Sequence, residues 1–336
     1  MMLKLICRTA CVRVFHKRYV RRLKQALLLF ALIHVNHTVS AYSDLVIFGD
    51  SLSDTGNVAQ YLGADLPYPY YENRISNGPV AVDVLAARLG LSAGHSGILF
   101  FSGEGSNYAI SGANAAGSDL HDLAAQFQSF LLDASQGVDA QALYLIMIGG
   151  NVVRDASVMG TAGETAAAVT AAVDAILQVL QALLDRGARN VLVSNAPDIS
   201  KIPETDERAL KHPGLHARAE QLSRDFNQQL REGIAQIDLD AQTRLYQFDL
   251  FEHFNAIVGQ PGLHGFSNYQ DPCFDFDSYS FHPQCDFERF VFFDSIHPTA
   301  RVHELLGLAM HETLQGTAVP APVINMAPII LYLLTD

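Results

Sequence analysis

The chain has 336 residues, of which 49% are hydrophobic and 17% are charged, which is the composition of a globular protein with ample material for a large core. Its net charge of −13 argues against a protein that binds nucleic acid or anionic membranes through its overall charge. No internal period indicates a repeat architecture.

The first 41 residues differ from the rest of the chain. They hold eight basic residues and no acidic one, and they end with the apolar run 26–35 and Val39-Ser40-Ala41. This order predicts a secretory signal peptide cleaved near Ala41, and therefore a secreted or periplasmic protein. The alternative is a membrane anchor, but the run is shorter than the ~20 residues that span a bilayer. Without this segment 14 basic and 35 acidic residues remain, a net charge of about −21.

Strands and helices alternate along the body of the chain. The continuous apolar run 142–148 indicates a strand covered on both faces, as in parallel sheets. The alternation predicts an α/β fold with one doubly wound, mostly parallel sheet and no linker that divides it. The other predicted strands lie at 45–48, within 107–114, at 190–194 and at 244–248, and the main predicted helices at 80–89, 119–132, 165–184, 217–237 and 301–314. We therefore expect a signal peptide at 1–41, one domain at 42–316 and a tail at 317–336.

Three segments do not follow this alternation. The segment 60–75 is rich in Tyr, Pro and Asn, and its tyrosines either line a substrate cleft or pack on the surface (Tyr61, Tyr68, Tyr70, Tyr71). The stretch 249–290 has a loop-like composition, and we expect a lid or one wall of a cleft there. The tail is apolar from 323 to 334 and too short for a secure membrane span, which leaves a sorting signal or a segment folded onto the body.

Four cysteines divide into two pairs. Cys7 and Cys11 lie in the predicted signal peptide, whereas Cys273 and Cys285 lie twelve residues apart in the loop-like stretch. An even pair in a secreted chain indicates a disulfide, and zinc would need further ligands at set spacings. We expect a disulfide between Cys273 and Cys285 and no metal site.

The strand at 45–48 runs directly into Gly-Asp-Ser-Leu-Ser-Asp-Thr-Gly-Asn, residues 49–57. A buried strand that leads into small polar residues carries side chains to the edge of the sheet where α/β proteins bind ligands. A strand followed by a capped helix would use the same residues, because Ser and Asp are good N-caps. The full string resembles the first block of the GDSL lipase/esterase family, in the SGNH hydrolase superfamily, where the serine, here Ser51, is the nucleophile.

Further blocks match this family in its own order. The string 107–114 resembles the second block, in which the glycine at the position of Gly112 donates its N–H to the oxyanion hole; alone, Gly112 would indicate only a tight turn. Gly149-Gly150-Asn151 resembles the third block, in which the asparagine is another oxyanion donor. The family usually has Asp next, as a supporting group, so Val152 puts the positioning of this loop in doubt. The string 74–80 resembles a further signature of GDSL lipases.

The last block lies near the carboxyl end, in Asp294-Ser-Ile-His297-Pro-Thr. A lone His before Pro is more often a packed or surface residue, but Asp-x-x-His-Pro-Thr resembles the family's final block. A spacing of three lets the carboxylate reach the imidazole within one loop. The chain order Ser, Asp, His is shared with α/β-hydrolases, but Ser51 lacks their Gly-x-Ser-x-Gly elbow.

The resemblance, over about residues 44–314, implies a three-layer α/β/α fold of the flavodoxin-like SGNH type. It also implies a bacterial secreted serine esterase or lipase with catalytic Ser51, Asp294 and His297 and oxyanion donors Ser51, Gly112 and Asn151. We expect no cofactor, a lipid or small-molecule ester as substrate, transient contact with lipid surfaces, no nucleic acid partner and a monomer. The alternatives are a carbohydrate O-acetylesterase, or a non-catalytic binding protein on the same scaffold.

Overall fold

The computed structural model describes residues 41–97 and 105–316, so the predicted signal peptide and tail lie outside the described residues, apart from Ala41. Four parallel strands form the central sheet in the spatial order β1-β2-β3-β4. They are β1 (Leu45–Gly49), β2 (Leu143–Met147), β3 (Asn190–Ser194) and β4 (Arg244–Phe248). Every residue of β1 and β2 is buried, which explains their unbroken apolar sequences.

An extended segment at 106–110 continues the sheet beyond β1. The N–H of Ile47 donates to the carbonyl of Ser106 at 3.0 Å, and the N–H of Tyr108 donates to the carbonyl of Ile47 at 2.7 Å. Counted as the second strand of the chain, this segment gives the order 2-1-3-4-5 of flavodoxin-like folds. The predicted parallel sheet is confirmed.

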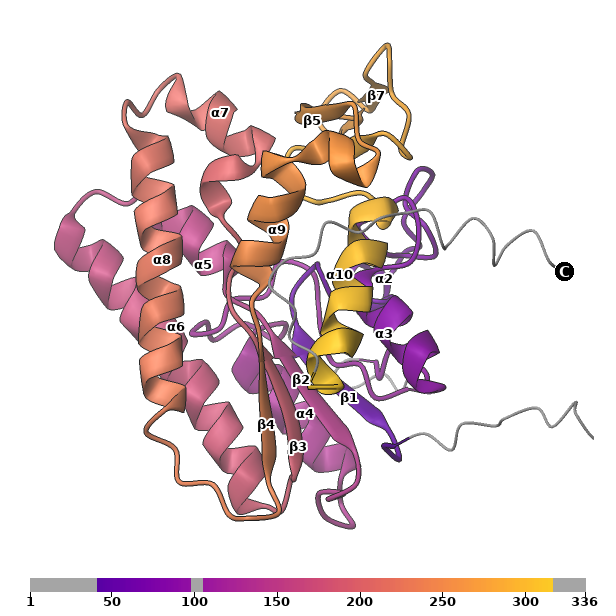
Figure 1. Cartoon of the computed structure of the whole chain (residues 1–336), viewed down its shortest axis with the longest axis vertical. Coiled ribbons are helices and arrows are strands. Elements are labelled where there is room, and N and C mark those ends of the chain that lie inside the picture. Colours follow the sequence, from indigo (N-terminus) through magenta and orange to yellow (C-terminus); the bar gives the residue numbers. More distant parts are fainter. Residues whose placement is uncertain (1–40, 98–104, 317–336) are drawn as a thin grey trace, which may run out of the picture. The chain divides into compact units, whose positions relative to one another are not determined.

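Helices cover both faces of the sheet (Figure 1). On one face α6 packs against both α4 and α8, and on the other α10 packs against α3 and α9. Their bounds are α3 (Ala81–Leu89), α4 (Leu123–Asp133), α6 (Ala162–Asp185), α8 (Leu215–Ile234), α9 (Leu250–Gly259) and α10 (Ala300–Leu314). Short helices complete the chain: α2 (Asn57–Leu62), α5 (Gly150–Ala156), η1 (Ile199–Lys201), α7 (Pro203–Ala209) and η2 (Pro261–His264). The predicted three-layer α/β/α fold is confirmed.

The stretch 249–290 contains more regular structure than its composition indicates, so its description as loop-like was wrong. Helix α9 opens it, capped by the Asp249 carboxylate, which accepts the N–H of Glu252 at 3.1 Å. Its buried residues lie on one helical face (Leu250, Phe251, Phe254, Ile257). The helical spacing of these apolar residues is short and polar residues follow it, so the composition of the whole stretch did not indicate a helix. Short strands follow: β5 (Asn268–Pro272) pairs with β8 (Phe290–Phe292), and β6 (Phe274–Asp275) pairs with β7 (Ser280–Phe281). A disulfide joins Cys273 to Cys285 across this region.

Within the described part of the chain, one helix is long and apolar enough to cross a bilayer by length and composition. This helix is α6, and its buried residues belong to the hydrophobic core (Val169, Val173, Ile176, Leu180, Leu183). Packing against the sheet and α8 therefore accounts for its apolar sequence.

Candidate active site

A cleft of about 570 Å³ lies at the carboxyl end of the sheet. The chain leaves β1 toward the segment at 106–110 and leaves β2 toward β3, so the order of the strands reverses between β1 and β2. Open α/β sheets bind ligands at this reversal. The cleft is lined by all five residues that the sequence predicts to carry chemistry: Ser51, Gly112, Asn151, Asp294 and His297.

Ser51, His297 and Asp294 form a continuous hydrogen-bonded chain. The Oγ of Ser51 lies 2.8 Å from Nε2 of His297, although 246 residues separate them. The Nδ1 of His297 lies 2.9 Å from both carboxylate oxygens of Asp294. The backbone N–H groups of Ile296 and His297 donate to Oδ1 of Asp294 at 2.9 and 2.7 Å, so the same carboxylate holds the loop and the ring.

The electrostatics of this loop favour an ionised Asp294. Burial by itself would raise the pKa of this carboxyl group. The charge of His297 and the hydrogen bonds from its ring and the loop backbone outweigh burial, and the pKa lies below its ordinary value. An ionised Asp294 fixes the imidazole with Nδ1 protonated and leaves Nε2 to accept the Ser51 proton.

Three residues that line the cleft, Ser51, Gly112 and Asn151, carry N–H groups that could serve as hydrogen-bond donors. Within the described residues, no protein acceptor takes the N–H of Ser51 or of Gly112. Gly112 has φ +87°, a conformation that favours glycine, and it lines the cleft. One N–H of the Asn151 amide donates to the carbonyl of Ala113 at 2.9 Å, which orients the amide and leaves its second N–H available.

Asp54, which the sequence analysis assigned no role, joins the nucleophile loop to the second block. Its Oδ2 accepts the N–H and the hydroxyl of Ser111 at 2.8 and 2.9 Å, directly before Gly112. Its Oδ1 accepts the N–H groups of Gly56 and Asn57, both at 2.8 Å, at the start of α2. Burial raises its pKa. Asp54 therefore sets the position of Gly112 relative to Ser51, as well as capping a helix.

Asp50, directly before the nucleophile, joins the first block to the third. It is 4% exposed, and it accepts hydrogen bonds from the N–H groups of Leu52 and Gly149. Burial raises its pKa to about 6, against the lowering effects of these hydrogen bonds and of His297 and Arg154. The only sequence signal for this role was its place beside Ser51.

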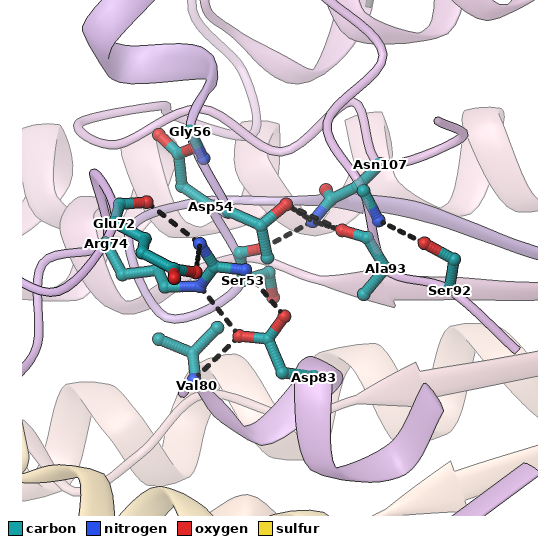
Figure 2. Close-up of polar contacts among 12 residues, drawn as sticks. Ser53, Asp54, Gly56, Glu72, Arg74, Val80, Asp83, Ser92, Ala93 and Asn107 are labelled. Carbon is teal, nitrogen blue, oxygen red and sulfur yellow. Dashed lines mark hydrogen bonds and ion pairs between the residues drawn. The ribbon is translucent and has the colours of Figure 1, made fainter. Parts of the chain in front are cut away.

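Buried and partly buried polar side chains hold the loop after β1 and the segment 74–80 from outside the cleft (Figure 2). The amide of Asn107 donates to the carbonyl of Ser53 at 2.7 Å and to the hydroxyl of Thr55 at 2.9 Å. Arg74 makes a two-point ion pair with Asp83 at 2.8 and 2.9 Å, and Asp83 in turn accepts the N–H of Val80. These contacts tie the segment 74–80 to α3.

Val152 stands where the resembling family usually has Asp. Its side chain is partly buried and packs against the hydrophobic core. The loop that it follows is held instead by Asp50, through Gly149, and by the amide of Asn151, through Ala113. With Val152 in place of Asp, Asn151 still lines the cleft.

Aromatic and acidic residues line the rest of the cleft. Of the four tyrosines in segment 60–75, Tyr70 lines it, together with Phe274 and Phe276. Glu207 and Asp277 are acidic members of the lining, and Arg154 is basic. Burial raises the pKa of Glu207, and the charges of Glu204, Asp275 and Asp277 raise it further.

One group of described residues, Asp119, His121 and Asp122, brings potential metal ligands within 4.8 Å of one another. The two carboxylate oxygens of Asp122 already accept the N–H groups of Asn114 and Asp119 at 2.7 and 2.8 Å. These bonds give Asp122 a structural role at the start of α4, and none of the three residues lines the cleft.

Comparisons with known proteins identify the family of this chain. A family model described as GDSL-like Lipase/Acylhydrolase matches residues 45–310. Lipase 1 of Photorhabdus luminescens is 33% identical over 180 residues, which are 53% of this chain and 26% of that protein. The phosphatidylcholine-sterol acyltransferase of Aeromonas hydrophila is 26% identical over 242 residues, covering 70% of this chain and 66% of that protein. The chain thus spans about a quarter of the first relative and about two thirds of the second.

Solved structures also match at low identity. An α/β hydrolase from the metagenome of Lake Arreo, Spain, is 17% identical with a TM-score of 0.43, covering 83% of this chain and 98% of that chain. An acetylxylan esterase from Geobacillus stearothermophilus, solved as a catalytic mutant, is 14% identical with a TM-score of 0.42, covering 81% of this chain and 93% of that chain.

Proposed function

Because the chain belongs to the GDSL-like lipase/acylhydrolase family, we propose that it is a serine ester hydrolase that forms an acyl-enzyme on Ser51. The observation that carries this proposal is the 2.8 Å contact between the Ser51 hydroxyl and His297, whose other ring nitrogen contacts Asp294. A serine hydroxyl is a weak nucleophile unless a base within hydrogen-bond reach takes its proton.

The proposed reaction has two halves. His297 takes the Ser51 proton as Oγ attacks the ester carbonyl, and then gives that proton to the leaving alcohol. Water attacks the acyl-enzyme by the same route and releases the carboxylic acid. Asp294 keeps Nδ1 protonated and stabilises the imidazolium form of His297 in both halves.

The developing negative charge on the carbonyl oxygen needs donors, and we assign this role to the N–H groups of Ser51 and Gly112 and the amide of Asn151. The support is that all three residues line one cleft and that other bonds hold their positions: Asp54 beside Gly112, and Ala113 beside Asn151. Donors of this kind are oriented before the reaction, so they stabilise the charge without reorganisation.

For the substrate we propose a carboxylic ester of a lipid. The aromatic lining, with Tyr70, Phe274 and Phe276, suits an acyl chain, and the relatives include a lipase. Transfer of the acyl group to an alcohol other than water is a second candidate, since a relative is named phosphatidylcholine-sterol acyltransferase.

The test compares hydrolysis of a short-chain nitrophenyl ester by the parent, Ser51→Ala and the matched control Ser118→Ala, whose serine is exposed. We expect Ser51→Ala to lose nearly all activity and the control to keep it. An organophosphonate probe should label the parent and the control but not Ser51→Ala. Equal rates in all three would reject a catalytic Ser51. A parent that neither hydrolyses the ester nor reacts with the probe would favour a binding protein.

A second panel addresses the substrate. Phospholipids and an acetylated carbohydrate, each with and without an added acceptor alcohol, separate lipid hydrolysis, acyl transfer and carbohydrate deacetylation. We expect fatty acid release from the lipid, whereas release of acetate alone would favour a carbohydrate O-acetylesterase.

We also propose that the protein acts outside the cytoplasm after removal of residues 1–41. The support is the basic and then apolar N-terminal sequence, together with a disulfide, a bond that persists in oxidising compartments. The mass of the protein recovered from a bacterial host's periplasm or medium tests this, and an intact first segment would contradict it.

A further inference from the structure

Four aromatic side chains next to the cleft are unusually exposed: Tyr68 (75%), Phe276 (65%), Tyr279 (49%) and Phe281 (41%). We call them the aromatic rim. They come from two segments more than two hundred residues apart in the sequence, so the tertiary fold brings them together. Large apolar groups gathered on one surface are typical of interaction sites, whereas single exposed ones are common.

Direct contacts join the rim to the wall of the cleft. The rings of Tyr68 and Phe281 lie 5.9 Å apart, and Phe281 lies 5.3 Å from Phe274, a cleft residue. Tyr279 lies 5.2 Å from Phe274, and its hydroxyl donates to the carbonyl of Tyr68. Phe276 belongs to both the rim and the cleft. A surface that meets the rim would therefore lie at the mouth of the cleft.

The charges around the rim decide what kind of surface it meets. Asp275, Asp277 and Glu207 are acidic neighbours in the cleft, close enough for the first two to raise the pKa of the third. The basic residue of the cleft lining, Arg154, and the cations near these segments in the sequence, Arg74 and Arg289, lie in ion pairs with acidic residues. Anionic lipids attract basic clusters and would be repelled here, whereas a zwitterionic surface carries no net charge.

We propose that the aromatic rim docks the protein onto a zwitterionic lipid surface and thereby places the cleft over its ester substrate. This inference rests on the proposed function, because it takes the ester to be part of a lipid. Tyrosine rings suit the boundary between lipid headgroups and acyl chains, since their bodies are apolar and their hydroxyls polar. The disulfide of Cys273 with Cys285 closes the loop that carries three of the four rim residues.

The binding test uses Ser51→Ala as the parent, so that the protein does not consume the lipid. Its cosedimentation is measured with phosphatidylcholine vesicles and with vesicles that also contain phosphatidylglycerol. A variant with Tyr68→Ser and Phe281→Ser should bind phosphatidylcholine on the order of tenfold more weakly, since two rings lose their burial. The matched control carries Leu132→Ser and Leu210→Ser, which are 67% and 87% exposed and outside the rim, and should bind as the parent does.

The rate on a soluble nitrophenyl ester, measured with Ser51 restored, shows whether the rim variant is folded. We expect a rate equal to that of the wild type. If the double variant is impaired, Tyr68→Ser alone replaces it, because Tyr68 is the most exposed member of the rim.

Three results of the binding assay would overturn the inference: no binding of the parent to phosphatidylcholine, stronger binding to the anionic vesicles, or unchanged binding of the rim variant. A fourth would be light scattering that shows a dimer in the parent and a monomer in the rim variant, because the rim would then join two copies of the chain. In each case the proposed function stands if the wild type hydrolyses the soluble ester. Failure of that hydrolysis is the separate result that would reject the proposed function.

Discussion

At the residue scale, two buried carboxylates beside the nucleophile differ in their ionisation. The pKa of Asp294 lies below its ordinary value, because the charge and hydrogen bonds of His297 outweigh burial. Burial dominates at Asp50 and raises its pKa to about 6. Asp294 is thereby suited to pair with a charged imidazole. At Asp50 the hydrogen bonds from backbone N–H groups favour the ionised form but offset only part of the effect of burial.

Asp50 should make the stability of the protein depend on pH. Between the ordinary value of 3.8 and about 6, the folded state binds more protons at this site than the unfolded state. The contribution of Asp50 to the free energy of unfolding is therefore fully present below pH 3.8, and it is lost as the pH rises through about 6. We expect the free energy of unfolding of Asp50→Asn, relative to wild type, to increase by on the order of 3 kcal/mol across this window.

Urea unfolding at a series of pH values measures this difference. The matched control is Asp174→Asn on α6, whose carboxylate is exposed, and its curve should run parallel to that of the wild type. If the free energy of unfolding of Asp50→Asn also changed with pH in parallel with that of the wild type, burial would not raise the pKa of Asp50.

Asn151 provides a direct test of the oxyanion assignment. Removing one such donor typically lowers kcat by about 10²–10³-fold, so Asn151→Ala should fall in this range on the short-chain ester with little change in KM. Asn190→Ala is the matched control, because Asn190 lies at the start of β3, at the opposite end of the strand from the cleft. An unchanged kcat for Asn151→Ala would remove this residue from the site.

At the element scale, the start of α10 depends on a distant residue. The assigned N-cap, Thr299, directs its hydroxyl to the carbonyl of Phe290. Instead, the side-chain oxygen of Asn77 accepts the N–H of Ala300 at 2.9 Å. Next to it, a Cβ on Gly78 would lie 2.7 Å from that of Ala300, so only glycine permits this approach. The segment 74–80 thus anchors the helix that follows His297.

We therefore expect Asn77→Ala to destabilise the protein by ~1 kcal/mol, the usual cost of a lost N-cap. It should also lower kcat, because the loop that carries His297 leads into α10. Asn77→Asp keeps an acceptor oxygen and should restore most of the stability. Urea unfolding and ester hydrolysis measure the two effects, and an equal loss of stability in both variants would argue against capping.

At the scale of the whole molecule, the site depends on parts that only the fold assembles. The wall of the cleft includes β6 and the loop after it, which a disulfide closes between Cys273 and Cys285. A cross-link over a loop of this length typically contributes about 3 kcal/mol by restricting the unfolded chain.

Replacing both cysteines by serine should lower the free energy of unfolding by about that amount. The effect on catalysis should fall mainly on KM for a lipid ester, because the loop carries Phe276 and Asp277 and not the catalytic serine or histidine. Thermal unfolding and steady-state kinetics measure both effects, with reduced wild type as the control. Equal stability of the oxidised wild type and the variant would contradict the prediction.

Local motifs in the sequence were enough to select residues that the fold brings into one cleft. Ser51, Gly112, Asn151, Asp294 and His297 each sit in a short string with its own signature, and the continuous apolar strands predicted the parallel sheet. The roles of Asp50 and Asp54 could not be predicted from the sequence, because small acidic residues after a strand are equally typical of helix caps. Helix α9 did not follow either, because its apolar face is short and polar loop residues come after it.

The amino-acid sequence by itself determined the alternation of strands and helices and the kinds of side chain at the strand ends, because both depend on neighbours within a few positions. Only the tertiary structure decided which of these ends meet. The 2.8 Å contact of Ser51 with His297, the aromatic rim and the cap of α10 by Asn77 each join segments more than two hundred residues apart. The physical reason is that contacts over such separations are set by how the helices pack on the sheet, which no local pattern encodes.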